Sequence, residues 1–174
     1  MPSTFSIEPA HDNYTAVRVL FAEYTRTPGV VETCYKSYEA ERDNLPGDFA
    51  EPDGRLYLAY VDDEPSGCIA MRRFDDTRCE MKRLFVLEKH RGQHIAEALV
   101  EKLLTDAHQE KYAAMVLTTM DTMQTAQALY QKKGFLPVSA FDNDSRENVI
   151  HFEKRLSTQR GPRCHPGARA PAIV

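Results

Sequence analysis

A basic turn between two regular segments is the part of this sequence whose residues point most directly to chemistry. Residues 81–87 have the pattern of a strand, residues 88–94 form a turn, and Ile95 opens a helical pattern. A strand that leads into a helix N-terminus leaves several backbone N–H groups unpaired and directed at one place. The helix dipole adds positive potential there, and so do Lys89 and Arg91. The turn therefore predicts an anion site suited to phosphate; the alternative is a plain connection with solvated bases.

The turn and the first helical residues run Arg91, Gly92, Gln93, His94, Ile95 and Ala96. In this order they resemble the acetyl-CoA-binding motif of the GNAT superfamily of N-acetyltransferases, written Arg/Gln-x-x-Gly-x-Gly/Ala. Residues 80–86 resemble the family's fourth strand, and residues 125–135 resemble its later helix, which commonly ends Leu-Tyr-x-Lys-x-Gly-Phe. The three features occur in the family's order over most of residues 4–156. The resemblance implies a GNAT-like acyl-CoA N-acyltransferase fold, with acetyl-CoA as co-substrate.

His94 departs from this motif, because the family places its central glycine there. Glycine lets phosphate oxygens approach the backbone closely. A helical φ at His94 would remove the difficulty, and the imidazole could then contact phosphate itself. The alternative is weaker cofactor binding.

The resemblance also implies how the cofactor and the acceptor meet. In GNAT enzymes the pantetheine arm lies along the fourth strand, and Phe85 and Val86 are the matching positions here. The fourth and fifth strands splay apart, so that the thioester and the amine meet between them. An alkylamine has a pKa near that of lysine, about 10.4, so it must lose a proton before it attacks.

Two residues are candidates for the proton transfers. Glu80, early in the fourth strand, is the candidate base, and the alternative is an ion pair with Arg72 or Arg73 across the hairpin. Tyr130 matches a tyrosine that often acts as the general acid in this family, so it is the candidate acid for the departing CoA thiolate. A tyrosine on an Ala/Leu helical face is otherwise typical of a core.

Hydrophobic periodicity predicts the elements that must position these residues. The predicted strands cover residues 4–7, 55–61, 68–74, 79–87, 113–120, 138–141 and 148–156. The predicted helices cover a segment capped by Asp12 or Asn13 and ended by residues 27–29, then residues 31–42, 95–107 and 124–133. This order predicts a mixed α/β fold, a largely antiparallel sheet flanked by helices, as one domain over residues 1–156. Residues 157–174 contain Pro and Gly but no acids, and they are expected to form a disordered tail.

Charge is distributed unevenly along the 174 residues, whose formal net charge is −4. Residues 1–64 hold 13 acids and 5 bases, a net of −8. The acids of the second helix and the loop after it are Glu32, Glu39, Glu41, Asp43 and Asp48. In the layout that the resemblance implies, this region borders the acceptor, where carboxylates would attract a cationic amine. The alternative is a solvated acidic face. An acidic domain also repels nucleic-acid phosphates, so duplex binding is not expected.

The remaining polar residues predict no further chemistry. The four cysteines, Cys34, Cys68, Cys79 and Cys164, lack metal-binding spacing and are expected to be free thiols of a reducing compartment. His90 and His94 have no apparent third ligand, so no metal is expected. The sequence has no secretory signal pattern and no apolar run of membrane-spanning length. A cytoplasmic monomer or homodimer without a membrane partner is expected.

The sequence therefore predicts an acetyl-CoA-dependent N-acetyltransferase. Its expected acceptor is the primary amine of a small molecule or amino acid, which attacks the thioester directly in a ternary complex. One alternative is a peptide or protein N-acetyltransferase. The other is a non-catalytic acyl-CoA-binding or regulatory module on the same fold.

Overall fold

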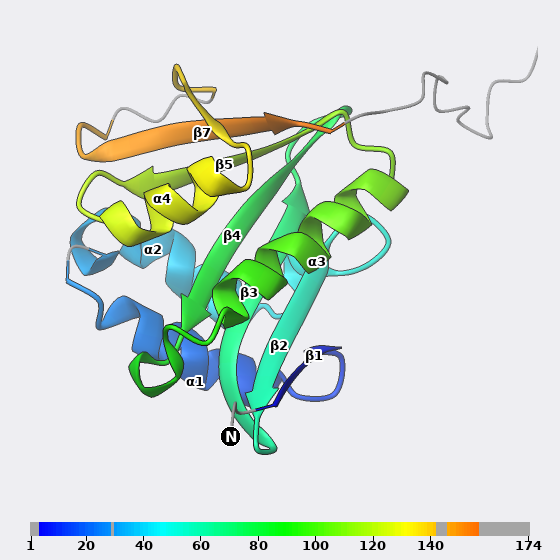
Figure 1. Ribbon diagram of the computed structural model, residues 1–174, viewed down its shortest axis with the longest axis vertical. Coiled ribbons are helices and arrows are strands. Elements are labelled where there is room, and N and C mark those ends of the chain that lie inside the picture. Colours follow the sequence, from blue (N-terminus) through cyan, green and yellow to red (C-terminus); the bar gives the residue numbers. More distant parts are fainter. Residues whose placement is uncertain (1–3, 29, 142–145, 157–174) are drawn as a thin grey trace, which may run out of the picture.

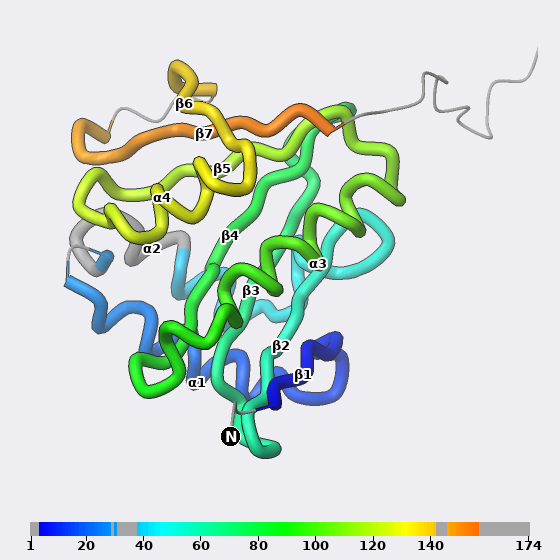
Figure 2. The backbone as a smooth tube through the Cα atoms, viewed as in Figure 1, coloured from blue at the N-terminus to red at the C-terminus, as the bar shows by residue number. Residues whose placement is uncertain are grey.

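The computed structural model describes residues 4–28, 30–141 and 146–156, with residues 31–37 described by their backbone alone. A seven-stranded sheet runs through it in the order β1-β2-β3-β4-β5-β7-β6 (Figures 1 and 2). The strands are β1 Phe5–Pro9, β2 Arg55–Val61, β3 Glu64–Arg73, β4 Arg78–Val86, β5 Ala114–Met120, β6 Leu136–Val138 and β7 Val149–Arg155. The helices are α1 Tyr14–Thr25, α2 Val30–Asp43, α3 Ile95–Gln109, α4 Gln124–Lys132 and two short 3-10 helices, Gly47–Phe49 and Glu88–His90. The expected tail, 157–174, lies outside the described residues.

The sheet is antiparallel except where β4 meets β5. That parallel pairing joins only Arg78–Glu80 to Ala114–Val116. Beyond Glu80 the two strands separate, and Figure 1 shows β4 running diagonally away from β5. The mixed, largely antiparallel sheet flanked by helices is thus confirmed, and it contains a gap between two central strands. We call the space between β4 and β5 beyond Glu80 the central gap.

Helices cover both faces of the sheet (Figure 1). On one face, α1 and α2 contribute Val17, Leu20, Phe21 and Tyr38 to a buried cluster with β2 and β3. On the other face, α3 and α4 pack on a second cluster that includes Leu99, Leu103 and Tyr130. The sheet therefore separates two cores, and the central gap is where side chains from the two faces can meet.

Local signals in the sequence explain how α1 and α4 begin and end. Asn13, one of the two expected caps, accepts a hydrogen bond from the Ala16 N–H at 3.2 Å and so begins α1. Three apolar residues of α1 are buried at helical spacing: Val17, Leu20 and Phe21. Gly134 follows α4 with φ +85°, a conformation that glycine adopts at helix ends without strain.

Two predicted strand boundaries were wrong. Strand β3 begins at Glu64 and not at residue 68, because the hairpin turn needs only Asp62 and Asp63, which have φ of +50° and +64°. A two-residue turn with both central φ values positive matches the twist of the flanking strands, so pairing resumes at once. Strand β6 covers Leu136–Val138 and not residues 138–141, because the chain enters the sheet edge directly after Gly134. Pro137 is tolerated there because an edge strand has one unpaired side.

The described cysteine side chains agree with the expectation of thiols outside disulfides, since Cys68 and Cys79 are buried and neither forms a disulfide. Burial raises the pKa of the Cys68 thiol to about 12. The side chains of Cys34 and Cys164 lie outside the described residues. No helix in the described part of the chain is both long enough and apolar enough to cross a membrane.

Candidate active site

The basic turn predicted from the sequence joins β4 to α3. Strand β4 ends at Val86, a 3-10 turn covers Glu88–His90, and α3 begins at Ile95. Between them Gly92 and His94 both have positive φ, +76° and +61°. Left-handed residues in such a turn direct neighbouring backbone N–H groups into a concavity that suits an anion.

His94 does not have the helical φ that would remove the difficulty of a side chain at the motif's glycine position. With φ +61° and ψ +13°, His94 adopts the left-handed conformation that the motif's glycine would take freely. For a residue with a Cβ this conformation costs roughly 1–2 kcal/mol. The imidazole is 80% exposed, and its Nδ1 lies 3.3 Å from Glu97 Oε2. It therefore leans along α3 and leaves the turn open.

The turn also contains polar atoms that lack a partner. Gln93 Oε1 and His90 Nε2 are buried and have no hydrogen-bond partner among the described residues. By helix geometry the backbone N–H groups of Ile95 and Ala96 have no intrahelical acceptor. The free helix N–H groups are donors that fit a phosphate-bearing ligand, so the residues present suit the phosphates of a CoA.

The two predicted basic residues of the turn, Lys89 and Arg91, both interact with nearby groups of the protein. Lys89 Nζ lies 2.7 Å from Glu64 Oε2, an exposed pair that closes the β2–β3 hairpin against the turn. Arg91 Nε donates to the Val86 carbonyl at 3.2 Å. Arg91 thereby ties the turn to the end of β4, where the predicted Phe85 and Val86 lie.

Strand β4 offers a free edge toward the central gap. It pairs with β3 along most of its length, but with β5 only up to Glu80. From Met81 to Val86 no described strand pairs with the other edge. An extended chain of amides, such as a pantetheine arm, can add to such an edge as an extra strand.

A bulge in β4 changes the direction of Arg83. Between the pairs Ala70↔Lys82 and Cys68↔Phe85, three steps on β4 oppose two on β3, and Arg83 has φ +58°. Neighbouring residues of a regular strand point to opposite faces. Here Lys82 and Arg83 both reach Glu41 of α2, and the Arg83 Nε to Glu41 Oε2 distance is 2.7 Å. Arg83 was not among the predicted site residues, because nothing in its sequence neighbourhood indicates the bulge.

Aromatic rings connect Arg83 to the rest of the central gap. The guanidinium carbon of Arg83 lies 5.8 Å from the ring centroid of Tyr24 and 5.7 Å from that of Tyr38. Tyr24 in turn lies edge-on to Phe85, with ring centroids 6.1 Å apart. Tyr24 comes from α1 on one face of the sheet and Phe85 from β4, so the gap brings the first helix onto the expected cofactor strand.

Tyr130, the predicted acid, is buried on α4 at the opposite side of the gap. Its ring centroid lies 6.0 Å from that of Phe135 and 6.1 Å from that of Phe152. Burial raises the pKa of the Tyr130 phenol, and the negative charge of a neighbouring Tyr24 phenolate would raise it further. Tyr130 therefore keeps its proton at neutral pH. Tyr130 also belongs to the core cluster, so the same side chain packs in the core and borders the gap.

Glu80, the predicted base, lies at the closed end of the gap. Its Oε2 accepts a hydrogen bond from Arg72 Nε at 2.7 Å, and the two residues are register partners across β3 and β4. The cross-strand ion pair considered from the sequence is therefore present. Arg72 Nη1 also lies 3.7 Å from Asp48 Oδ2, so Glu80 is part of a small charge network.

The acids of α2 and its loop mostly have basic partners. Glu41 contacts Lys82 and Arg83, and Asp43 Oδ1 accepts from Arg42 Nε at 2.8 Å. The side chain of Glu32 lies outside the described residues. In the part of the chain that the structure describes, no group of three or more His, Cys, Asp or Glu side chains could hold a metal ion.

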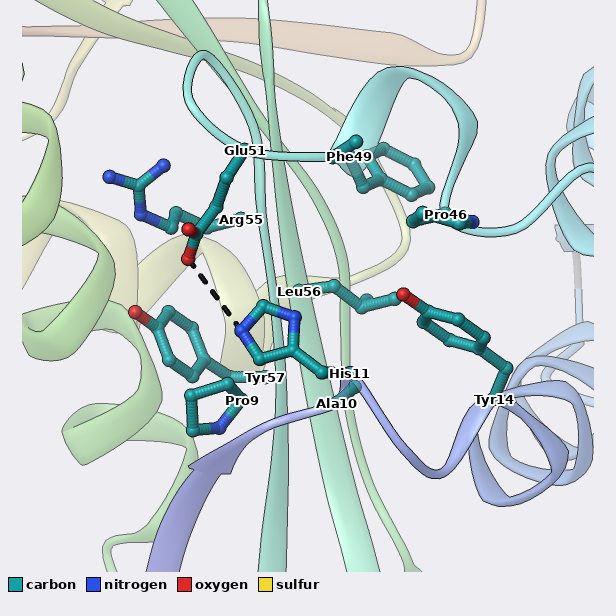
Figure 3. A pocket seen from close by; sticks show the side chains of 11 residues that line it. Pro9, Ala10, His11, Tyr14, Pro46, Phe49, Glu51, Arg55, Leu56 and Tyr57 are labelled. Atoms are coloured by element: carbon teal, nitrogen blue, oxygen red, sulfur yellow. Dashed lines mark ion pairs between the residues drawn. The ribbon is translucent and has the colours of Figure 1, made fainter.

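A separate pocket of about 140 Å³ lies where β1 and α1 meet the loop before β2 (Figure 3). His11 Nε2 and Glu51 Oε1 are 3.7 Å apart across it, with Tyr14 and Tyr57 on either side. None of the predicted site residues lines this pocket. It is therefore distinct from the central gap.

A model of the Acetyltransferase (GNAT) family matches residues 16–135, which include most of α1, all of α2 and α4, and the basic turn. The chain belongs to the GNAT family. As a GNAT acetyltransferase it is an acyltransferase.

Relatives of this GNAT acetyltransferase include an uncharacterized N-acetyltransferase of Dictyostelium discoideum, 27% identical over 85% of this chain and 96% of that protein. N-acetylaspartate synthetase of Homo sapiens is 33% identical over 53% of this chain and 31% of that protein. Among solved structures, PaiA N-acetyltransferase from Thermoplasma acidophilum, in complex with coenzyme A, aligns with a TM-score of 0.70. That alignment covers 87% of this chain and 99% of the other at 14% identity, so it supports the fold alone.

Proposed function

We propose that this GNAT acetyltransferase transfers the acetyl group of acetyl-CoA to the primary amine of a small molecule or amino acid. The observation that carries the proposal is the central gap, which has the cofactor turn at the end of β4 and Tyr24, Arg83 and Tyr130 around it. N-acetylaspartate synthetase, a relative over half of this chain, is named for the N-acetyl derivative of an amino acid. That name supports an amino acid acceptor.

The cofactor end of the site would hold acetyl-CoA in two ways. The concave turn at Gly92 and His94, with the N–H groups of Ile95 and Ala96, would bind the phosphates. The free edge of β4 at Phe85 and Val86 would pair with the pantetheine amides. When bound, the co-substrate supplies an activated acetyl thioester.

The residues around the gap would move two protons. In direct attack within a ternary complex, the C–N bond forms while the C–S bond breaks. Glu80, directly or through a water, would accept the proton that the amine loses. Tyr130 would give its phenolic proton to the thiolate that leaves, and the raised pKa of Tyr130 keeps that proton in place until then.

Two measurements on the unmodified protein test this function. Calorimetry with acetyl-CoA should detect binding, with weaker binding of 3′,5′-ADP, which lacks the pantetheine arm. A thiol assay for CoA release should then give turnover with at least one class in a panel of amino acids, monoamines, diamines and short peptides. Absence of acetyl-CoA binding at millimolar concentration would refute the proposal.

The same panel separates the two alternatives. Turnover restricted to peptides would indicate a peptide or protein N-acetyltransferase. Acetyl-CoA binding without CoA release would favour a non-catalytic acyl-CoA-binding module. The cationic acceptor, the cytoplasmic location and the monomeric or homodimeric state expected from the sequence stay predictions.

A further inference from the structure

We propose that the acceptor amine carries a carboxylate and that Lys82 and Arg83 bind it. The acceptor would then be an amino acid or a similar amino carboxylate, and not a polyamine. This inference rests on the proposed N-acetyltransferase function and specifies the acceptor class of the same site.

The position of Arg83 is the first argument. Arg83 lies three residues beyond Glu80, the last residue of β4 that pairs with β5, so it borders the central gap. Its guanidinium packs on one side of Tyr24, whose ring also contacts Phe85 on the expected path of the pantetheine arm. Although Arg83 belongs to β4, its guanidinium is thus separated by the Tyr24 ring from Phe85. A small acceptor bound at this guanidinium would therefore lie beside the expected path of the pantetheine arm.

The bulge supplies the second argument, because it gathers two cations at one place. Lys82 and Arg83 are neighbours in the sequence, yet both contact Glu41. Their side chains are 14% and 4% exposed, so bulk water screens them little. A guanidinium has five N–H donors and an ammonium three, whereas one carboxylate offers about four acceptor positions. The pair therefore has the capacity to hold a second carboxylate beside Glu41.

The surrounding rings fix the direction of the guanidinium. Tyr24 and Tyr38 lie within 6 Å of its central carbon, at 5.8 and 5.7 Å. Arginine held in this way presents a planar fork that matches a carboxylate in two hydrogen bonds. The site is thus preorganised for a planar anion.

Two of the acids that a cationic acceptor could use are already engaged. Glu41 lies between Lys82 and Arg83, and Glu80 accepts from Arg72. A polyamine would have to displace a resident cation from one of these carboxylates. A carboxylate acceptor adds a negative charge to a group in which cations outnumber the one carboxylate that they share.

The test compares acceptors in matched pairs by CoA release. L-Leucine, L-phenylalanine and β-alanine are each assayed beside their carboxamides, together with aspartate, glutamate, putrescine and spermidine. A charge-assisted pair of hydrogen bonds predicts kcat/KM about 10- to 150-fold higher for at least one acid than for its amide. Diamines should react no better than the amides.

Arg83→Gln should lower the ratio of kcat/KM for an acid to that for its amide to about threefold or less. Arg83→Lys should restore part of it. The matched control is Arg78→Gln: Arg78 also lies on β4, has carboxylate partners and packs over an aromatic ring, that of Phe74. Arg78 precedes the gap, so the control should keep the full preference. If Arg83→Gln does not fold, Lys82→Gln, whose side chain is less buried, should show the same loss.

Two results would overturn the inference. One is turnover of amides or diamines equal to that of acids. The other is a folded Arg83→Gln variant that loses activity on acids and amides equally, which would make Arg83 structural. If no acceptor reacts, calorimetry of the CoA complex with leucine and aspartate decides, since no binding also refutes it. Failure to bind acetyl-CoA would refute the proposed function itself, whereas turnover of amines without carboxylates refutes only the acceptor class.

Discussion

At the scale of single residues, the central gap makes one side chain serve both packing and chemistry. Tyr130 packs against Phe135 and Phe152, and it is close enough to Tyr24 for the two phenols to interact electrostatically. A raised pKa keeps the phenol protonated, which suits a donor, and makes phenolate formation costly, which slows donation. Only a kinetic measurement weighs these two effects.

Tyr130→Phe should lower kcat by about 10²- to 10⁴-fold, because it removes the proton donor and keeps the ring. The Kd of acetyl-CoA should change less than about threefold. Tyr60→Phe is the control. Tyr60 lies on β2, away from the gap, and its hydroxyl accepts a hydrogen bond from Asn13 Nδ2. Steady-state kinetics and calorimetry check both values. A lost affinity with kcat preserved would instead place Tyr130 in binding or folding.

Glu80→Gln should remove the low-pH limb of the kcat/KM profile. A base must be ionised to accept a proton, so activity that depends on Glu80 falls as the pH decreases and the carboxylate is protonated. The amide cannot titrate, and the variant should be slow and insensitive to acid pH. Glu153→Gln, which removes a carboxylate 3.7 Å from Arg78, is the control. A variant with an unaltered pH profile would leave Glu80 only its ion pair with Arg72.

At the scale of elements, the start of α3 carries the largest departure from the motif. His94 adopts a glycine conformation while its side chain lies against Glu97. The turn therefore keeps its shape at the expense of backbone strain. A substitution that preserves the shape should preserve binding.

His94→Gly should bind acetyl-CoA at least as tightly as the unchanged protein. Its stability should change by less than about 1 kcal/mol, because relief of strain offsets the greater entropy of an unfolded glycine. His94→Val should destabilise by more than about 1 kcal/mol, since a β-branched residue is poorly tolerated at positive φ. Urea unfolding and calorimetry measure the two effects. A tenfold loss of affinity in His94→Gly would show that the imidazole contacts phosphate.

The turn between β3 and β4 sets the register of the strand that carries the site. Asp75 is partly buried, which favours its neutral form. The N–H groups of Thr77 and Arg78 and the Arg78 guanidinium nevertheless lower its pKa to about 2. A carboxyl with a depressed pKa stabilises the fold above its unfolded pKa, near 3.9, and this stabilisation is lost as the pH falls toward 2.

Asp75→Asn should therefore lower Tm by a few degrees at pH 6, and the difference should disappear between pH 4 and pH 2. Asp76→Asn is the control, because Asp76 is 96% exposed and its ion pair with Arg73, at 2.7 Å, lies on the surface. Thermal unfolding at a series of pH values makes the comparison. A Tm difference that persists at pH 2 would mean that Asp75 acts through packing and not through charge.

At the scale of the whole molecule, stability comes from two cores separated by the sheet. Leu103 of α3 is completely buried in the larger cluster, on the face that also holds Tyr130. The candidate site draws Tyr24 from α1 on one face of the sheet and Tyr130 from α4 on the other. The site thus depends on both faces remaining packed.

Leu103→Ala should destabilise the fold by about 2–5 kcal/mol through the cavity that it leaves. Val19→Ala on α1, where the side chain is 57% exposed, should change stability by less than about 0.5 kcal/mol. Urea unfolding gives both values. A loss below about 1 kcal/mol in Leu103→Ala would show that the core collapses into the space.

The sequence predictions were accurate where the deciding interactions lie within a few residues of the chain, and less accurate where distant residues meet. Helix α1 and the turn at Gly92 were anticipated because caps, periodicity and glycine act within a few residues. The predicted start of β3 was too late in the sequence. The positive φ of Asp62 and Asp63, which makes the turn short, depends on the pairing of β2 with β3. The alternatives for Glu80 could not be separated from sequence, since Arg72 meets it only across the folded hairpin.

The sequence by itself determined the order of elements, the cofactor turn and the family resemblance, because each is written in local spacing. Only the tertiary structure decided what lies opposite the cofactor. Glu41 meets Lys82 and Arg83 across about 40 residues of chain, with separations of 41 and 42. A bulge in β4 and the packing of α2 on the sheet create that meeting. Neither feature has a local sequence signal, because both arise from contacts between distant elements.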